Sequence, residues 1–264
     1  MLSEGESSSS GDAHSCFEQW MDLQKSDLSD LMQALSRQTK EEEEEEDSCS
    51  LDDGYSELLD KSIQHFEEYM KDRCRLAQRD TAASSYLAPG WCSTLENSLL
   101  WIGGCRPSIF IRLTYALCRL ESENHPSQAV NGEETKMMAD LTSQQISEID
   151  ALRSKTVLEE DKLATRLASL QEDVGDYPLA AVAVKCSDQV ADMSSIIEKA
   201  LESHEKCLVK VLEEADKLRM STLKELLLVL KPKQGVDLLA AGKKIHLSLH
   251  EWGKVKDAEN GSRN

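Results

Sequence analysis

Apolar residues recur every three or four positions along most of this chain, which is the spacing of one face of an α-helix. A clear example begins at Ile146, where the spacing continues through Ile149 and Leu152 to Leu170. The five prolines fall mostly between such periodic segments, and aromatic residues are few, which favours helices over strands. The sequence therefore predicts an all-α fold.

The predicted architecture is a multi-helix bundle with two long antiparallel helices and a short C-terminal helix. We expect helices over residues 14–37, 52–80, 95–101, a segment that begins at Pro107, 142 to about 175, 187–230 and 235–252. Two stretches match the capping box, in which a first side chain and one three residues later each bond the other's backbone N–H. These pairs are Ser93 with Glu96 and Thr142 with Gln145. The long helices favour an antiparallel pair, with a coiled-coil dimer as the open alternative.

The predicted domain covers residues 14–256 as a single helical unit. Residues 1–13 are rich in Ser, Gly and Glu and are expected to form a disordered tail, as are residues 257–264. Two loops interrupt the domain, at 40–53 and 121–141. The first contains six consecutive glutamates, whose mutual repulsion favours a solvated loop.

The net charge limits the classes of function. A formal charge of −19 argues against a self-sufficient nucleic-acid binder, which needs a stripe of Lys and Arg to displace counterions from phosphates. No apolar run is long enough to cross a membrane, and the acidic N-terminus does not look like a secretion signal. Eight cysteines without a C-x-x-C pair predict reduced thiols rather than disulfides or a cysteine zinc site. We therefore expect a soluble, intracellular protein.

Two histidines lie four residues apart in the last helical segment, "KKIHLSLHEWG". His246 and His250 are expected on one flank of the helix, beside an apolar face of Leu238, Ala241, Ile245, Leu249 and Trp252. Their spacing would let both imidazoles meet one small ion, but zinc needs more ligands than this pair supplies. Two histidines on one helix approach from the same side, so they cannot sandwich a haem unless the helix unwinds locally. The alternatives are a ligand pair, with one histidine binding iron and the other supporting it, and two polar residues at the boundary of a packed face.

The segment "WIGGCRPS" has the Gly-Gly turn and helix start that can hold an anion beside Arg106. No P-loop or dinucleotide fingerprint is present, so a tight corner between helices, with Arg106 paired to an acid such as Glu96, is the favoured interpretation. No set of residues resembles a known catalytic motif, and we expect no enzyme activity.

The segment "FEQWMDLQ" carries Phe17, Trp20 and Met21. An aromatic pair beside a methionine is a common composition for residues that anchor a partner protein. The alternative is that these side chains pack into the protein's own core.

Several segments together resemble the plant Delay of Germination family. In order along the chain, over about residues 14–256, they are "FEQWMDLQ", "YLAPGWCSTLENSLLWIGGCRPSIFIRLTYAL", "SLQEDVGDYPLA", "EADKLRMSTL" and "AGKKIHLSLHEWG". The same domain forms the C-terminal part of the TGA-type bZIP transcription factors, in which a basic region and a zipper precede it. Nothing basic precedes residue 14 here, so we expect no direct contact with nucleic acid.

The resemblance implies a non-enzymatic regulator of seed dormancy and abscisic-acid responses that binds and restrains clade A type 2C protein phosphatases. It places the phosphatase contact on Phe17, Trp20 and Met21, and haem on His246 and His250, with no other metal. Pollen aperture formation is another process in which this family acts. The rival hypothesis is a transcriptional cofactor that joins bZIP proteins through the TGA-like domain. A purely structural scaffold is a third, and a homodimer is compatible with each.

Overall fold

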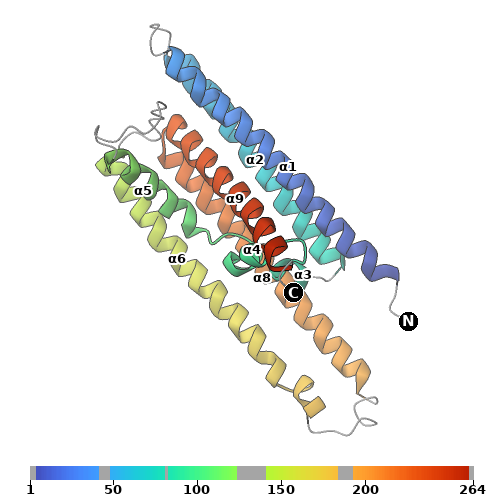
Figure 1. Cartoon of the computed structure of the whole chain (residues 1–264). Helices are drawn as coiled ribbons and strands as arrows, with labels where there is room; N and C mark the ends of the chain where they lie inside the picture. The colour runs from blue at the N-terminus through green and yellow to red at the C-terminus, as the bar shows by residue number, and fades with distance from the viewer. Residues whose placement is uncertain (1–3, 42–47, 81–82, 124–140, 184–192, 262–264) are drawn as a thin grey trace.

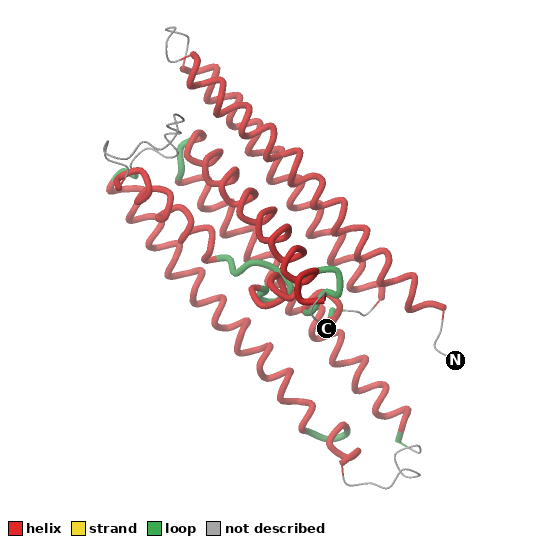
Figure 2. The backbone as a smooth tube through the Cα atoms, viewed as in Figure 1, coloured by secondary structure: helices red, strands yellow, loops and turns green. Residues whose placement is uncertain are grey.

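The computed structural model describes residues 4–41, 48–80, 83–123, 141–183 and 193–261, and all of its regular elements are helical (Figures 1 and 2). The predicted all-α fold is therefore confirmed. The elements are α1 (Glu4–Glu41), α2 (Ser48–Asp80), α3 (Ser84–Leu87), α4 (Thr94–Leu99), α5 (Ser108–Glu123), α6 (Ser143–Glu172), the short 3-10 helices η1 (Asp173–Gly175) and η2 (Leu179–Ala183), α8 (Ser194–Val229) and α9 (Pro232–Gly261).

The long helices run side by side in antiparallel pairs. Helices α1 and α2 form one pair, and α6 and α8 form the pair that the sequence predicted (Figure 1). Helix α9 lies between the two pairs and contacts α1, α2, α4 and α5. Both predicted capping boxes are present, at Ser93 with Glu96 on α4 and at Thr142 with Gln145 on α6.

Apolar side chains from α5, α6, α8 and α9 meet in one buried cluster. The buried members of this cluster are Ile111, Leu117, Ile149, Leu152, Leu226, Leu230, Leu238 and Ala241. A separate cluster joins α1 and α2 to the start of α9 through Leu31, Tyr55, Leu59, Val236 and Ala240. The first part of α9 is thus buried on several sides, which explains its central position.

The sequence predicts a short C-terminal helix, but α9 spans 30 residues. Pro232 occupies its first position, where the missing N–H of proline costs nothing. Gly253 does not end the helix. This glycine lies close against Ser93, and a Cβ atom in its place would be only 2.0 Å from the Ser93 hydroxyl oxygen. The glycine therefore allows close packing and is not a helix end. Further on, the Asp257 carboxylate accepts hydrogen bonds from the backbone N–H and hydroxyl of Thr94, so the helix continues into residues 257–261.

The predicted tails and loops are also shorter than expected. Helix α1 begins at Glu4 instead of residue 14, since Asp12 accepts a hydrogen bond from Arg79 at 2.7 Å and Ala13 is buried. Residues 40–41 and 48–53 of the expected acidic loop are helical, and so are 121–123 of the second loop. The remainder of these loops, at 42–47 and 124–140, lies outside the described residues.

A buried ionic network supports the turn between α4 and α5. Arg219 donates hydrogen bonds to the carbonyl oxygens of Trp101, Ile102 and Cys105, and Arg73 donates one to that of Gly103. Both guanidinium groups also pair with Asp216 on α8. The segment "WIGGC" is therefore a structural corner, as the favoured interpretation of the sequence held.

Candidate functional site at the junction of α1, α4 and α9

His250 is buried and lies against helix α4. Its Nδ1 atom is 2.7 Å from a carboxylate oxygen of Glu96. The other oxygen of Glu96 accepts hydrogen bonds from the backbone N–H and the hydroxyl of Ser93, at 2.8 and 2.6 Å. The capping box of α4 thus also fixes the orientation of the His250 ring.

The Glu96 carboxylate is held in its charged form. Burial alone would raise its pKa, but the hydrogen bonds from Ser93 and from His250 outweigh that effect and lower it. A charged acceptor at Nδ1 orients an imidazole and makes its other nitrogen a stronger electron donor. The sequence favours a pairing of Arg106 with an acid such as Glu96. That pairing is wrong, because Arg106 bonds Glu160 at 2.6 Å and Asp161 at 3.3 Å.

His246 lies one turn before His250 and has a different environment. Burial lowers the pKa of His246 from 6.5 to about 4, a shift that the nearby Glu96 carboxylate opposes and His250 and Lys243 reinforce. The imidazole is therefore neutral at neutral pH, which is the form that binds metals.

The lowered pKa of His246 predicts a pH dependence of stability. Between pH 6.5 and pH 4 the unfolded chain binds a proton at His246 that the folded chain does not, so stability falls as the pH falls through this window. Between pH 7 and pH 5 we expect the parent protein to lose about 2 kcal/mol more unfolding free energy than the His246→Gln variant. Urea unfolding at both pH values measures this difference, and equal losses in the two proteins would contradict it.

The expected apolar face of α9 is correct only in its first half. Leu238 and Ala241 are buried, whereas Ile245 is 46% exposed and Trp252 is 65% exposed. The covered side in the second half instead carries His250 and Gly253, because α1 and α4 pack there. Helical spacing cannot reveal that the neighbours of a helix change along its length.

The three predicted partner-binding residues lie in the core of this junction. Phe17, Trp20 and Met21 are all buried. The ring of Phe17 meets that of His250 edge-on, with centroids 5.7 Å apart. The packing alternative therefore describes these side chains in this conformation, and their binding of a partner stays a prediction. Their apolar character drives them onto α2 and α9 as readily as onto a partner.

A second polar contact joins α1 to α9 nearby. Asp27 is buried and accepts a hydrogen bond from Lys243 at 2.8 Å, while its other oxygen lies 2.8 Å from Nδ1 of His65. Neither Asp27 nor Lys243 was singled out from the sequence. An aspartate in a helix interior gives no signal of its own, because its partner is 216 residues away.

The junction fits a haem only in part. The donors are suitable, since His246 is neutral and His250 is oriented by a carboxylate. The packing is less suitable, because the ring of Phe17 meets that of His250 edge-on. In this packing Phe17 covers one edge of the His250 ring, so haem would reach that side of His250 only if α1 moved away from α9. Within the described residues, no group of three or more potential ligands is placed to hold a metal ion.

Comparison with known proteins identifies the family. The model of a family described as "Seed dormancy control" matches residues 27–116. Protein DOG1-like 3 of Arabidopsis thaliana is 38% identical over 92% of this chain and 84% of its own length. Protein DOG1-like 1 of the same species is 37% identical over 92% of this chain and 89% of its own length. The chain belongs to the DOG1 family. It is thus a member of a regulatory family related to seed dormancy, as the sequence motifs indicated.

More distant similarity extends to transcription factors. Transcription factor TGA6 of Arabidopsis thaliana is 25% identical over 70% of this chain but only 49% of its own length. The DOG1-family chain therefore matches about half of that protein.

Among the helices that the structure describes, none combines the length and the apolar character that a membrane span requires.

Proposed function

We propose that this DOG1-family protein is a non-enzymatic regulatory binding protein of seed dormancy and abscisic-acid signalling. It acts in the nucleus and cytoplasm, where it binds and restrains clade A type 2C protein phosphatases through α1. The observation that carries the proposal is the contact between Phe17 on α1 and His250 on α9. It joins the proposed partner segment to the proposed ligand residues.

Helix α1 offers a partner two different surfaces. Its outer side carries the exposed residues Glu18, Gln19 and Asp22, which a partner can reach in the packed conformation. Its inner side carries Phe17 and Trp20, which a partner can reach only if α1 leaves α9. We propose the second mode, because buried aromatic residues make the stronger anchors.

A pull-down with a type 2C phosphatase tests this mode. The Phe17→Ala/Trp20→Ala variant is expected to lose most of the phosphatase recovered with the parent protein. Leu31→Ala is the matched control, since Leu31 is also fully buried on α1 but packs against Tyr55 and Val236. It loosens α1 without removing the anchors. Equal recovery in the two variants would refute the anchor role, and so would loss of binding in a Gln19→Arg variant alone.

We also propose that the protein binds haem through His246 and His250. The support is the donor chemistry, since both imidazoles lie on one side of α9 and His250 is oriented by Glu96. Haem would supply an iron centre whose occupancy the protein senses.

Titration of the purified protein with haem, followed by absorption spectroscopy, is expected to show a Soret shift. His246→Ala and His250→Ala weaken it, while His204→Ala on α8 does not. If both α9 variants keep the parent shift, these residues are not the ligands.

A second candidate function is that of a transcription-associated cofactor, which the similarity to TGA6 favours. It would join bZIP proteins through the shared helical domain without binding DNA itself, in keeping with the net charge of −19. Co-purification with bZIP proteins from nuclei, without a mobility shift of their DNA sites by the protein alone, would support it. Specific DNA binding by the purified chain would contradict both functions.

A further inference from the structure

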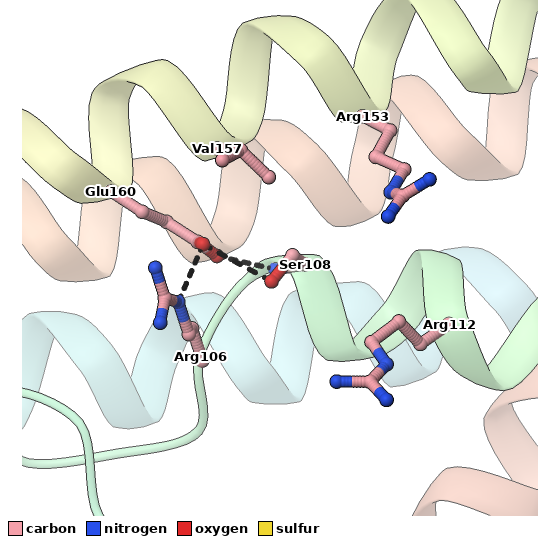
Figure 3. Close-up of a pocket in the computed structure, with 6 residues that line it drawn as sticks. All are labelled: Arg106, Ser108, Arg112, Arg153, Val157 and Glu160. Atoms are coloured by element: carbon pink, nitrogen blue, oxygen red, sulfur yellow. Dashed lines mark hydrogen bonds and ion pairs between the residues drawn. The ribbon is translucent and has the colours of Figure 1, made fainter.

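A cavity of about 410 Å³ opens between α5 and α6. Its lining consists of Arg106, Ser108, Arg112, Arg153, Val157 and Glu160 (Figure 3). The volume lies in the range of roughly 300–1,000 Å³ that is usual for ligand pockets. Three of the six lining residues are arginines, in a protein where acidic residues outnumber Lys and Arg by 49 to 30.

One end of the cavity is closed by an internal carboxylate. Glu160 is fully buried and accepts hydrogen bonds from Arg106 Nε and from the backbone N–H of Ser108, both at 2.6 Å. It also accepts one from the Ser108 hydroxyl at 3.1 Å. The start of α5 and Arg106 are therefore already satisfied. Any ligand must be recognised by the remaining two arginines.

Arg112 and Arg153 enter the cavity from opposite helices, α5 and α6 (Figure 3). Six other arginines have described side chains, and each forms an ion pair with an Asp or Glu: Arg73, Arg75, Arg79, Arg106, Arg166 and Arg219. Among the arginines that the structure describes in this way, Arg112 and Arg153 alone have no ion pair. Both line the same cavity, although acidic partners are abundant on the surface.

Three acids on the same helix as Arg153 already accept hydrogen bonds from other residues. Glu160 is bonded to Arg106 and Ser108, Asp161 to Arg106, and Asp150 accepts a hydrogen bond from the Tyr115 hydroxyl at 2.8 Å. Arg112 and Arg153 thus carry like charges on one cavity, whose lining carboxylate is already bonded to Arg106 and Ser108. An anion bound between them would reduce the repulsion of these charges.

We propose that this cavity is a binding site for a phosphate monoester, held by Arg112 and Arg153. The planar fork of a guanidinium group donates two parallel hydrogen bonds to a phosphate. Two such groups match the charge of nearly −2 that a phosphate monoester carries at neutral pH. The polar, open lining suits the charged group better than an apolar ligand. The phosphate can belong to a small molecule or to a phosphorylated side chain of another protein.

Calorimetric titration of the full chain at physiological ionic strength tests the site. The probes are inorganic phosphate, a phosphoserine peptide and the same peptide without phosphate. We expect saturable binding of both phosphorylated probes. In the Arg112→Gln/Arg153→Gln variant, affinity falls by about tenfold or more for each arginine removed, since hydrogen bonds between charged groups are lost.

The control is Arg75→Gln/Arg166→Gln, which removes the same charge from two exposed, paired arginines on α2 and α6. It is expected to change affinity less than threefold, because charges beyond the Debye length of about 8 Å are screened. Arg75, Arg112 and Arg153 are exposed and Arg166 is partly exposed, so both variants should unfold at the parent temperature. Tighter binding of the phosphopeptide than of inorganic phosphate identifies a protein ligand, and equal binding a small molecule. Absence of saturable binding, equal weakening in both double variants, or equal binding of the unphosphorylated peptide would overturn the proposal.

Discussion

Replacing Asp216 with Asn is expected to lower the free energy of unfolding by about 3–5 kcal/mol, the usual effect of removing one partner from a buried ion pair. Asp216 is buried between two buried guanidinium groups, those of Arg73 and Arg219. An amide has nearly the same shape but no charge, so both cations would be left without a counterion. Against a typical total stability of about 5–15 kcal/mol, this is a large fraction.

Urea unfolding followed by circular dichroism measures this loss. Glu214→Gln is the control, because Glu214 lies two residues away on α8 and pairs with Arg166 on the protein surface. Exposed pairs of this kind contribute roughly 0–1 kcal/mol. If Asp216→Asn were no more destabilising than Glu214→Gln, the buried network would not be what holds the turn between α4 and α5.

The network is important because the turn that it supports has a strained backbone. Ile102 and Gly103 both have positive φ angles, of 44° and 69°. Residues other than glycine rarely adopt this backbone region. A Cβ atom at Gly103 would lie 2.9 Å from the Tyr86 carbonyl oxygen. Hydrogen bonds from Arg73 and Arg219 to the carbonyl oxygens of this turn offset the strain. They also fix the direction in which α5, with one side of the arginine cavity, leaves the turn.

Trp20→Ala is the second substitution with a large expected effect, a loss of about 3–5 kcal/mol of unfolding free energy. The indole ring is buried and stacks on Tyr69 and Phe66, with centroid separations of 4.7 and 5.3 Å. The Lys243 ammonium group lies 5.7 Å from its centroid. Truncation would remove the stacking and leave a cavity between α1, α2 and α9.

The neighbouring substitution Gln19→Ala provides the comparison, because Gln19 is exposed on the same turn of α1. We expect it to change stability by less than about 0.5 kcal/mol. Thermal unfolding of the two variants and the parent measures both effects. A loss below about 1 kcal/mol for Trp20→Ala would mean that α1 is already loosely held in solution. In that case the aromatic side chains would be available to a partner without an opening step.

The helical segments were predictable because their signal is local. The three-and-four spacing of apolar residues, the two capping boxes and the break at Pro232 each depend on residues within one or two turns. The ends were less predictable. Residues 4–13 are helical in part because Asp12 meets Arg79 on α2, and residues 254–261 in part because Asp257 meets Thr94. Contacts between residues so far apart in sequence leave no local pattern.

The candidate sites show the same division. Sequence selected His246, His250, Phe17, Trp20 and Met21 as residues of interest, but it could not determine which sides of α1 and α9 are covered. The structure places Phe17 on His250 and gives Glu96 to His250 instead of Arg106. Pairing of side chains depends on which helices become neighbours.

The helical class of this protein, its acidic character, its DOG1-family membership and the residue types in its sites all follow from the sequence. The burial of the aromatic residues of α1, and the shared cavity of Arg112 and Arg153, two arginines that form no ion pair, become visible only in the folded chain. The physical reason is that helix formation follows from spacing within a few residues. Burial and ion pairing arise between side chains that chain folding brings together from distant positions.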